Sequence, residues 1–307
     1  MLGTIAEREP GMTVRAPREQ ENARHPEARA TAGSRAEVVA LAAVYLVSAA
    51  ALVGFATFAM HPELLVRANV PAATYAQMMV LAPRAQIVLA FLALGGFLWH
   101  RVRGRWLGTF AVVYLISLGA ELAGTTVGVP FGPYRYTDGL GWKWFAHVPA
   151  LIPASWYMMA LPSYAIACWR FPKGRSVMAR VALGSFILLS WDLSLDPAMS
   201  LATKYWVWGT AGPYYGMPLL NLFGWFVTGV VLMGVFVVMR ADSWIAELSP
   251  AWLIGYYGAN LLLPVGMSVA AGMWGAVVAT AVALMAAWLT ARTGRPGRLA
   301  RVGGAAA

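Results

Sequence analysis

Three acidic residues stand apart because they fall within apolar stretches of the sequence. Glu121, Asp192 and Asp196 each lie near one end of a hydrophobic segment, whereas the other ten of the 13 acidic residues fall in expected tails and loops. A carboxylate in a membrane helix is costly, so such residues usually bind a ligand or transfer a proton. The alternative is a structural role, as an ion pair with a nearby Arg or Lys or as a carboxylate wetted at the membrane surface.

Asp192 and Asp196 lie four positions apart, a spacing that puts both side chains on one face of a helix. Two neighbouring carboxyl groups in a poorly hydrated place cannot both ionise cheaply, so one is expected to keep its proton. A protonated carboxylic acid is what general acid catalysis requires. Because Pro197 disfavours helical geometry at the residue before it, we expect the helix to fray at Asp196 and to expose its side chain to the following loop.

Aromatic residues are concentrated in two loops, each of which follows an acid-bearing segment. The loops cover residues 129–147 and 205–216, and their rings alternate with turn-forming Gly and Pro. Trp and Tyr also collect at membrane surfaces without any further role. The concentration in two loops favours a shared site with the three carboxylates. Asn221, early in the next apolar segment, is a candidate to hydrogen-bond either a ligand or a neighbouring helix.

The composition defines the class of protein that must position these residues. The chain has 307 residues, of which 60% are hydrophobic and 12% charged, and its mean hydropathy is +0.62. Soluble domains are about 45–50% apolar and about 25% charged. These values exclude an ordinary soluble enzyme, a disordered protein and a nucleic-acid binder. A single cysteine, Cys168, excludes a disulfide framework, and four scattered histidines give no reason to expect a metal site.

Apolar stretches predict an all-α, polytopic transmembrane helix bundle with about eight spans, with seven and nine as the alternatives. A bilayer core needs about 20 apolar residues per helix. We expect Pro83 to start the second helix, residues 73–82 to form an interfacial or re-entrant turn, and Gly272 to form the turn between the last two helices. The expected helices cover about 38–60, 85–100, 106–128, 148–169, 177–196, 218–239, 250–270 and 273–291.

The distribution of positive charge predicts the topology. With the N-terminus inside, 18 of the 23 basic residues fall on the cytoplasmic side, as expected when Lys and Arg are retained there. Both termini are then cytoplasmic, and the net charge of +10 is a topology signal that can also attract anionic lipid. The expected domains are a disordered cytoplasmic tail over residues 1–36, a transmembrane domain over residues 37–291 and a basic cytoplasmic tail over residues 292–307.

Several blocks of sequence, in the same order, resemble the integral-membrane carotenoid biosynthesis proteins. This family includes the CruF-type carotenoid hydratases and the C50 carotenoid hydratases of the bacterioruberin pathway. The resemblance covers residues 40–290, with its specific motifs between 121 and 225. These motifs are Glu121-x-x-Gly-Thr-Thr-x-Gly-x-Pro-Phe-Gly-x-Tyr-x-Tyr136, Leu140-Gly141, Val148-Pro149, Ile152-Pro153, Trp156, Leu195-Asp196-Pro197, Trp206-x-Trp208 and Tyr214-Tyr-Gly-x-Pro-Leu-x-Asn221-x-x-Gly-Trp225.

The resemblance implies a hydro-lyase that adds water across the terminal C1–C2 double bond of an acyclic (ψ) end group. The product is a tertiary 1-hydroxy carotenoid, and neither a redox change nor an organic cofactor is needed. We expect Asp192 or Asp196 to protonate the alkene and aromatic rings to stabilise the carbocation. The other aspartate or Glu121 would orient and deprotonate the attacking water. The expected substrate-binding residues are Tyr134, Tyr136, Trp156, Trp206, Trp208, Tyr214, Tyr215, Asn221 and Trp225.

Other functions remain open on the sequence alone. A cyclase-like carotenoid end-group enzyme would use the same acid and rings but exclude water. A carotenoid- or lipid-binding scaffold, or a proton-coupled transporter, would need no catalysis. The expected partners are an acyclic carotenoid, membrane lipid and, as candidates, other enzymes of the carotenoid pathway. The expected location is the inner membrane, with the aromatic loops on the periplasmic side.

Overall fold

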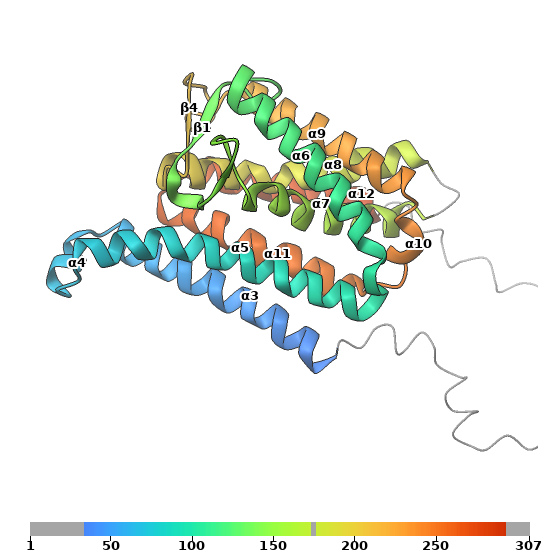
Figure 1. The fold of residues 1–307 in the computed structure, drawn as a ribbon, viewed down its shortest axis with the longest axis horizontal. Helices are drawn as coiled ribbons and strands as arrows, with labels where there is room; N and C mark the ends of the chain where they lie inside the picture. Colours follow the sequence, from blue (N-terminus) through green and yellow to red (C-terminus); the bar gives the residue numbers. More distant parts are fainter. Residues whose placement is uncertain (1–33, 173–175, 293–307) are drawn as a thin grey trace, which may run out of the picture.

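The computed structural model describes residues 34–172 and 176–292. The tails expected at residues 1–36 and 292–307 fall almost entirely outside this part of the chain. Within it, eight helices of 19 residues or more form one bundle (Figure 1). They are α3 (Arg35–Gly54), α5 (Ala72–Val102), α6 (Leu107–Val127), α7 (Leu151–Arg170), α8 (Val177–Asp196), α9 (Leu219–Val238), α11 (Pro250–Ala270) and α12 (Trp274–Arg292).

Shorter elements connect these helices. The helical ones are η1 (Phe55–Ala59), α4 (Glu63–Arg67), η2 (Arg103–Trp106), η3 (Asp138–Leu140), η4 (Pro197–Ala202) and α10 (Asp242–Ile245). The strands are β1 (Tyr134–Tyr136), β2 (Lys143–Trp144), β3 (Val148–Pro149) and β4 (Trp206–Trp208). The bundle is helical as expected, but the aromatic loops contain two small sheets that the all-α prediction did not include.

The helices have the length and composition of membrane-spanning segments. Six segments of the described residues are long and apolar enough to cross a membrane. One of them, Ala72–Val127, contains both α5 and α6, and α12 adds a shorter apolar helix over Trp274–Thr290. The chain is therefore a helical membrane protein, while the count of eight spans stays a prediction.

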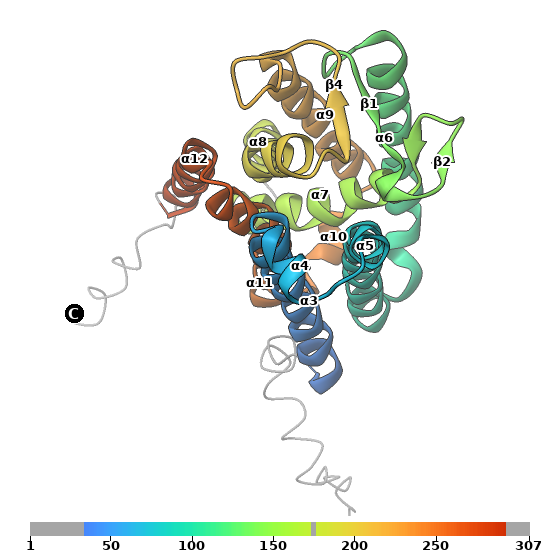
Figure 2. The ribbon, with the colours of Figure 1, turned by 90° about the vertical axis from the view of Figure 1, so that its left-hand side faces the viewer.

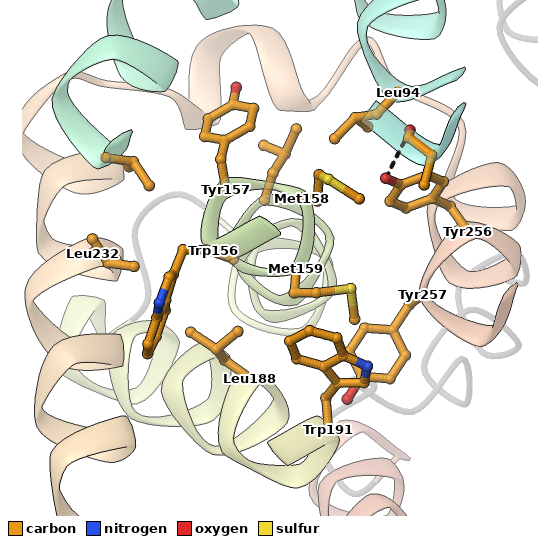
Figure 3. Close-up of a cluster of buried hydrophobic side chains, with 14 of the residues drawn as sticks. Leu94, Trp156, Tyr157, Met158, Met159, Leu188, Trp191, Leu232, Tyr256 and Tyr257 are labelled. Carbon is orange, nitrogen blue, oxygen red and sulfur yellow. Dashed lines mark hydrogen bonds between the residues drawn. The ribbon is translucent and has the colours of Figure 1, made fainter. Parts of the chain in front are cut away.

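Helix α7 lies at the centre of the bundle and contacts α5, α6, α8, α9 and α11. Figure 3 looks along α7 and shows Trp156, Tyr157, Met158 and Met159 directed outward from it toward the surrounding helices. All four side chains are buried. A central helix surrounded on all sides needs apolar residues all round, which explains why α7 carries no charge before Arg170 at its last position.

The two ends of the bundle differ in character. The start of α3 and the end of α12 lie at one end, whereas β1, β4 and α4 lie at the other (Figure 1). We call the second end the loop end; it comprises residues 128–150 and 203–218. Figure 2 views the molecule from this end and shows β1 and β4 side by side over α6, α8 and α9. Which end faces the cytoplasm stays a prediction.

Helix α5 differs from its prediction because it runs unbroken through Pro83. The expected turn over residues 73–82 is helical instead. Proline has no N–H, so it leaves the carbonyl four residues earlier without its helical partner. In α5 that carbonyl belongs to Met79, and it accepts a hydrogen bond from the Tyr205 hydroxyl at 2.6 Å. A donor from the loop end thus replaces the missing amide, as membrane helices with internal proline require.

The expected fraying at Asp196 is also wrong. Asp196 has helical dihedral angles, is only 3% exposed, and is followed directly by η4. The carbonyl that Pro197 cannot satisfy belongs to Leu193, and the Tyr214 hydroxyl donates to it at 2.8 Å. The same device recurs in α11, where Trp191 Nε1 donates to the Asn260 carbonyl, four residues before Pro264, at 3.2 Å. Three prolines therefore keep their helices continuous through aromatic donors from elsewhere in the chain.

Replacing Tyr214 by Phe should destabilise the protein. The change leaves the partly buried Leu193 carbonyl without a partner, which costs about 1–3 kcal/mol. Thermal unfolding in detergent should show a lower Tm for Tyr214→Phe than for Tyr215→Phe. The Tyr215 hydroxyl makes no hydrogen bond with the described residues, so its loss is the matched control. Equal Tm values for the two variants would contradict this role of Tyr214.

The loops at the loop end are joined by pairing between β1 and β4. The strands are antiparallel, with Tyr134 opposite Trp208 and Tyr136 opposite Trp206. Side chains of a strand alternate between its two faces, so Tyr134 and Tyr136 are buried while Arg135 between them is exposed. The pairing puts the Tyr-x-Tyr and Trp-x-Trp rings together on the buried face.

At the opposite end, Glu37 is buried rather than part of a tail or loop. It lies in the first turn of α3, where Ser34 and Glu37 form a reciprocal capping box. Arg101 from the end of α5 donates to its carboxylate at 2.7 Å, and His100 Nδ1 lies 2.9 Å from Oε1. This contact fixes the start of α3 against the end of α5.

Candidate functional site

Glu121 near the end of α6 is held by three hydrogen-bond donors. Tyr134 and Tyr136 donate their hydroxyls to Oε2, the latter at 2.7 Å, and Trp156 Nε1 donates to Oε1 at 2.8 Å. The glutamate is only 4% exposed. All three partners donate, so Glu121 is arranged to act as an acceptor.

The two tyrosines that contact Glu121 stay protonated. Burial and the neighbouring Glu121 carboxylate raise the pKa of Tyr134 and of Tyr136 well above the usual tyrosine value. Their hydroxyls are therefore permanent donors at physiological pH. The alternation along β1 delivers both rings to one carboxylate, which explains the Tyr-x-Tyr spacing.

Asp192 and Asp196 form a second acidic group, which is bridged by Asn221. Both aspartates lie on one face of α8, as their spacing predicts, and both are buried. Asn221, in the first turn of α9, donates from Nδ2 to Asp192 Oδ2 at 3.1 Å and to Asp196 Oδ2. Both carboxyl groups therefore contact the same amide nitrogen, and Trp206 of β4 lines the same cavity as Asp196. Asp192 Oδ1 is buried without a hydrogen-bond partner among the described residues.

Both acidic groups lie at one cavity, which we call the carboxyl pocket. It is lined by Glu121, Phe131, Tyr134, Tyr136, Ile152, Ser155, Trp156, Trp191, Leu195, Asp196, Trp206, Trp208, Asn221 and Trp225. Trp156 and Trp225 stack with their ring centroids 4.0 Å apart, and Trp191 meets Trp225 edge-on at 6.0 Å. The indole N–H of Trp208 is buried without a partner in the described structure. The pocket thus combines carboxyl groups with a wall in which eight of the fourteen residues are aromatic.

Two glycines let the first aromatic loop pack directly against the helices. A Cβ at Gly124 of α6 would lie 2.8 Å from Tyr134 and 2.9 Å from Phe131. A Cβ at Gly224 of α9 would lie 2.7 Å from both Phe131 and the Pro130 carbonyl. These distances are too short for any side chain larger than hydrogen, so the glycines set the position of Tyr134 over Glu121.

Gly124→Ala should therefore reduce function by moving Tyr134 away from Glu121. Overpacking of this kind costs about 1–3 kcal/mol. We expect a lower Tm in detergent and a lower activity per folded molecule. Gly119→Ala is the matched control, because a Cβ there would meet nothing within 4 Å. If Gly124→Ala and Gly119→Ala gave the same Tm and the same activity, the close packing at Gly124 would not be needed for function.

Most of the site residues expected from the sequence come together at the carboxyl pocket. Nine of the twelve expected residues line the pocket. Asp192 does not line it, but it accepts a hydrogen bond from Asn221, which does. Tyr214 and Tyr215 are not in the wall: Tyr214 bonds to the Leu193 carbonyl, and Tyr215 packs edge-on against Tyr214.

Five residues of the wall were not expected. They are Phe131, Ile152, Ser155, Trp191 and Leu195. Helical spacing offers a signal for Ile152, which precedes Trp156 by four residues and therefore shares a face of α7 with it. Among the described residues, no three or more His, Cys, Asp or Glu side chains are grouped to hold a metal ion.

The fold and the site define a helical membrane protein whose buried carboxyl groups face an aromatic pocket. Residues 83–287 match the family described as carotenoid biosynthesis protein. The chain belongs to this family, which confirms the resemblance seen in the sequence motifs and makes it a protein of carotenoid biosynthesis.

One curated relative of this chain is named as a hydratase. The chain is 28% identical over 123 residues to bisanhydrobacterioruberin hydratase of Haloarcula japonica. The aligned segment covers 40% of this chain and 41% of the relative, so it spans about two fifths of the relative's length. No solved structure matches the chain.

Proposed function

We propose that the protein adds water across the terminal C1–C2 double bond of an acyclic carotenoid and forms a tertiary 1-hydroxy carotenoid. The observation that carries this proposal is the carboxyl pocket, where an aspartate pair and a glutamate meet one aromatic wall. The hydratase relative and the family support the same reaction class. Hydration transfers no electrons, so the proposal includes no redox cofactor.

Asp196 is the proposed proton donor. Two buried carboxyl groups that share the Asn221 amide cannot both ionise cheaply, so the pair keeps one proton. Asp196 lines the pocket, whereas Asp192 is 0% exposed and does not. Asp196 therefore gives the proton to C2 of the end group, and Asp192 and Asn221 position it.

The remaining residues stabilise the cation and direct the water. Protonation at C2 leaves a tertiary cation at C1, and the faces of the surrounding rings attract it electrostatically. The water oxygen bonds to C1 and releases one proton to Glu121, the group arranged as an acceptor. Proton return from Glu121 to the aspartate pair through bulk water completes the cycle. One water is consumed and one C–H and one C–O bond form.

The membrane placement follows from the same proposal. We infer an inner-membrane protein with both termini in the cytoplasm and the loop end toward the periplasm, supported by the excess of basic residues expected at the opposite end. An acyclic carotenoid partitions into lipid, so substrate would arrive from the bilayer. Membrane lipid and other enzymes of the pathway are the proposed partners.

Expression in a lycopene-accumulating bacterium tests the reaction directly. Pigment extracts should contain products heavier than lycopene by one or two water molecules, as measured by mass spectrometry. Products of unchanged mass but changed retention would indicate cyclisation and contradict hydration. Unchanged lycopene that co-purifies with the folded protein would indicate a binder.

A further inference from the structure

The carboxyl pocket adjoins a larger apolar cavity inside the bundle. This inner cavity lies between α5, α7, α8 and α11 and has an empty volume of about 630 Å³, including its opening. It shares Ile152, Ser155, Trp191, Leu195 and Trp206 with the carboxyl pocket. Because five residues belong to both walls, the two cavities are neighbours separated only by these side chains.

A third cavity continues the series toward α3. This outer cavity is lined by residues of α3, η1, α5, η4 and α11. It shares Pro83, Met199, Tyr205 and Leu263 with the inner cavity. The three cavities therefore follow one another from the α3 side of the bundle to the carboxyl groups.

Several polar side chains in the wall of the inner cavity form hydrogen bonds with other protein groups. Ser155 Oγ donates to the Ile152 carbonyl at 2.8 Å, and the Tyr205 hydroxyl donates to the Met79 carbonyl at 2.6 Å. Gln86 Nε2 donates to Asn260 Oδ1 at 3.2 Å. The occupant that suits such a wall is a hydrocarbon chain without hydrogen-bonding groups.

We propose that the inner and outer cavities bind the linear hydrocarbon chain of the substrate while its end group lies in the carboxyl pocket. This inference rests on the proposed function for the identity of the occupant. It adds that the chain lies inside the bundle, between α5 and α11, rather than along the lipid-facing surface of the helices.

Pigment retention by an inactive background tests this inference without depending on turnover. Asp196→Asn protein is purified in mild detergent from lycopene-accumulating cells, and bound lycopene per protein is measured by absorbance. Adding Ile87→Trp places a large ring in the inner cavity, of which Ile87 is a wall residue. Bound lycopene should fall at least about fivefold, as expected when a cavity is overfilled.

The neighbouring position on α5 supplies the control. Val88 is 42% exposed and lines none of the three cavities, so Val88→Trp in the same background should retain as much lycopene as the parent. If Ile87→Trp fails to fold, Ala82→Phe replaces it and fills the outer cavity. Its control is Ala85→Phe, because Ala85 is exposed and outside the three cavities.

The outcomes separate this inference from the proposed reaction. Loss of lycopene with Ile87→Trp but not with Val88→Trp supports the internal chain site, even if the unmodified protein forms no hydrated product. Equal retention by the two variants, or no retention by the Asp196→Asn parent, overturns it. Hydrated products together with equal retention would leave the reaction intact and place the chain elsewhere.

Discussion

Asp196→Asn should abolish hydration while the protein still folds. The amide keeps the size of the side chain but cannot donate an acidic proton, and a lost general acid costs about a hundredfold to ten-thousandfold in rate. Asp192→Asn should also reduce the rate, because it removes the partner that shares the proton with Asp196. The measurement is the fraction of lycopene converted per folded protein, with folding checked by detergent size exclusion.

The control for these variants is Asp138→Asn. Asp138 lies at the same end of the bundle in η3, and its side chain is fully exposed and paired with Lys143 at 2.8 Å. The Lys143 ammonium holds the pKa of Asp138 below its usual range. The same chemical change should leave hydration unaltered there. Full activity of both Asp196→Asn and Asp192→Asn would contradict the proposed mechanism.

Glu121→Ala should have a large effect on stability as well as on activity. The change leaves the Tyr134, Tyr136 and Trp156 donors without their acceptor, and each buried donor left unsatisfied costs about 1–3 kcal/mol. We expect a marked fall in Tm in detergent and no hydrated product. Glu121→Gln keeps an acceptor oxygen but removes the charge, so it should lose less stability and still lose most activity.

Glu247→Ala provides the comparison for Glu121→Ala. Glu247 forms a half-exposed ion pair with Arg105 at 2.5 Å, and such pairs contribute about 0–1 kcal/mol. Its removal should shift Tm little and leave the pigment products unchanged. The proposed role of Glu121 would be refuted if its Ala variant behaved like that of Glu247.

The helices and the proximity of Asp192 to Asp196 could be predicted because both depend on local sequence. The central helix was expected at about 148–169 and runs from Leu151 to Arg170, and Gly272 with φ of +70° forms the expected turn before α12. The four-residue spacing of Asp192 and Asp196 placed them together. Each of these features follows from composition or helical period alone.

The departures from prediction depend on contacts that are distant in sequence. Pro83 remains helical because of a hydroxyl at Tyr205, and nothing near Pro83 signals that donor. The strands β1 and β4 pair across α7 and α8 in sequence, so their register could not be read from either loop. Wall residues such as Ser155 and Leu195 have no chemical signal of their own, and only packing assigns them to the pocket.

The aromatic donors that serve the proline-containing helices restrict how this protein can change its specificity. Trp191 and Tyr205 line cavities and also satisfy backbone carbonyls of α11 and α5. A mutation that reshapes the cavity at either residue also removes a buried hydrogen bond. New substrate preferences should therefore evolve more readily through Ile87, Met159 or Leu263, which line the inner cavity and satisfy no backbone carbonyl through their side chains. A directed-evolution library confined to such positions should yield more folded variants.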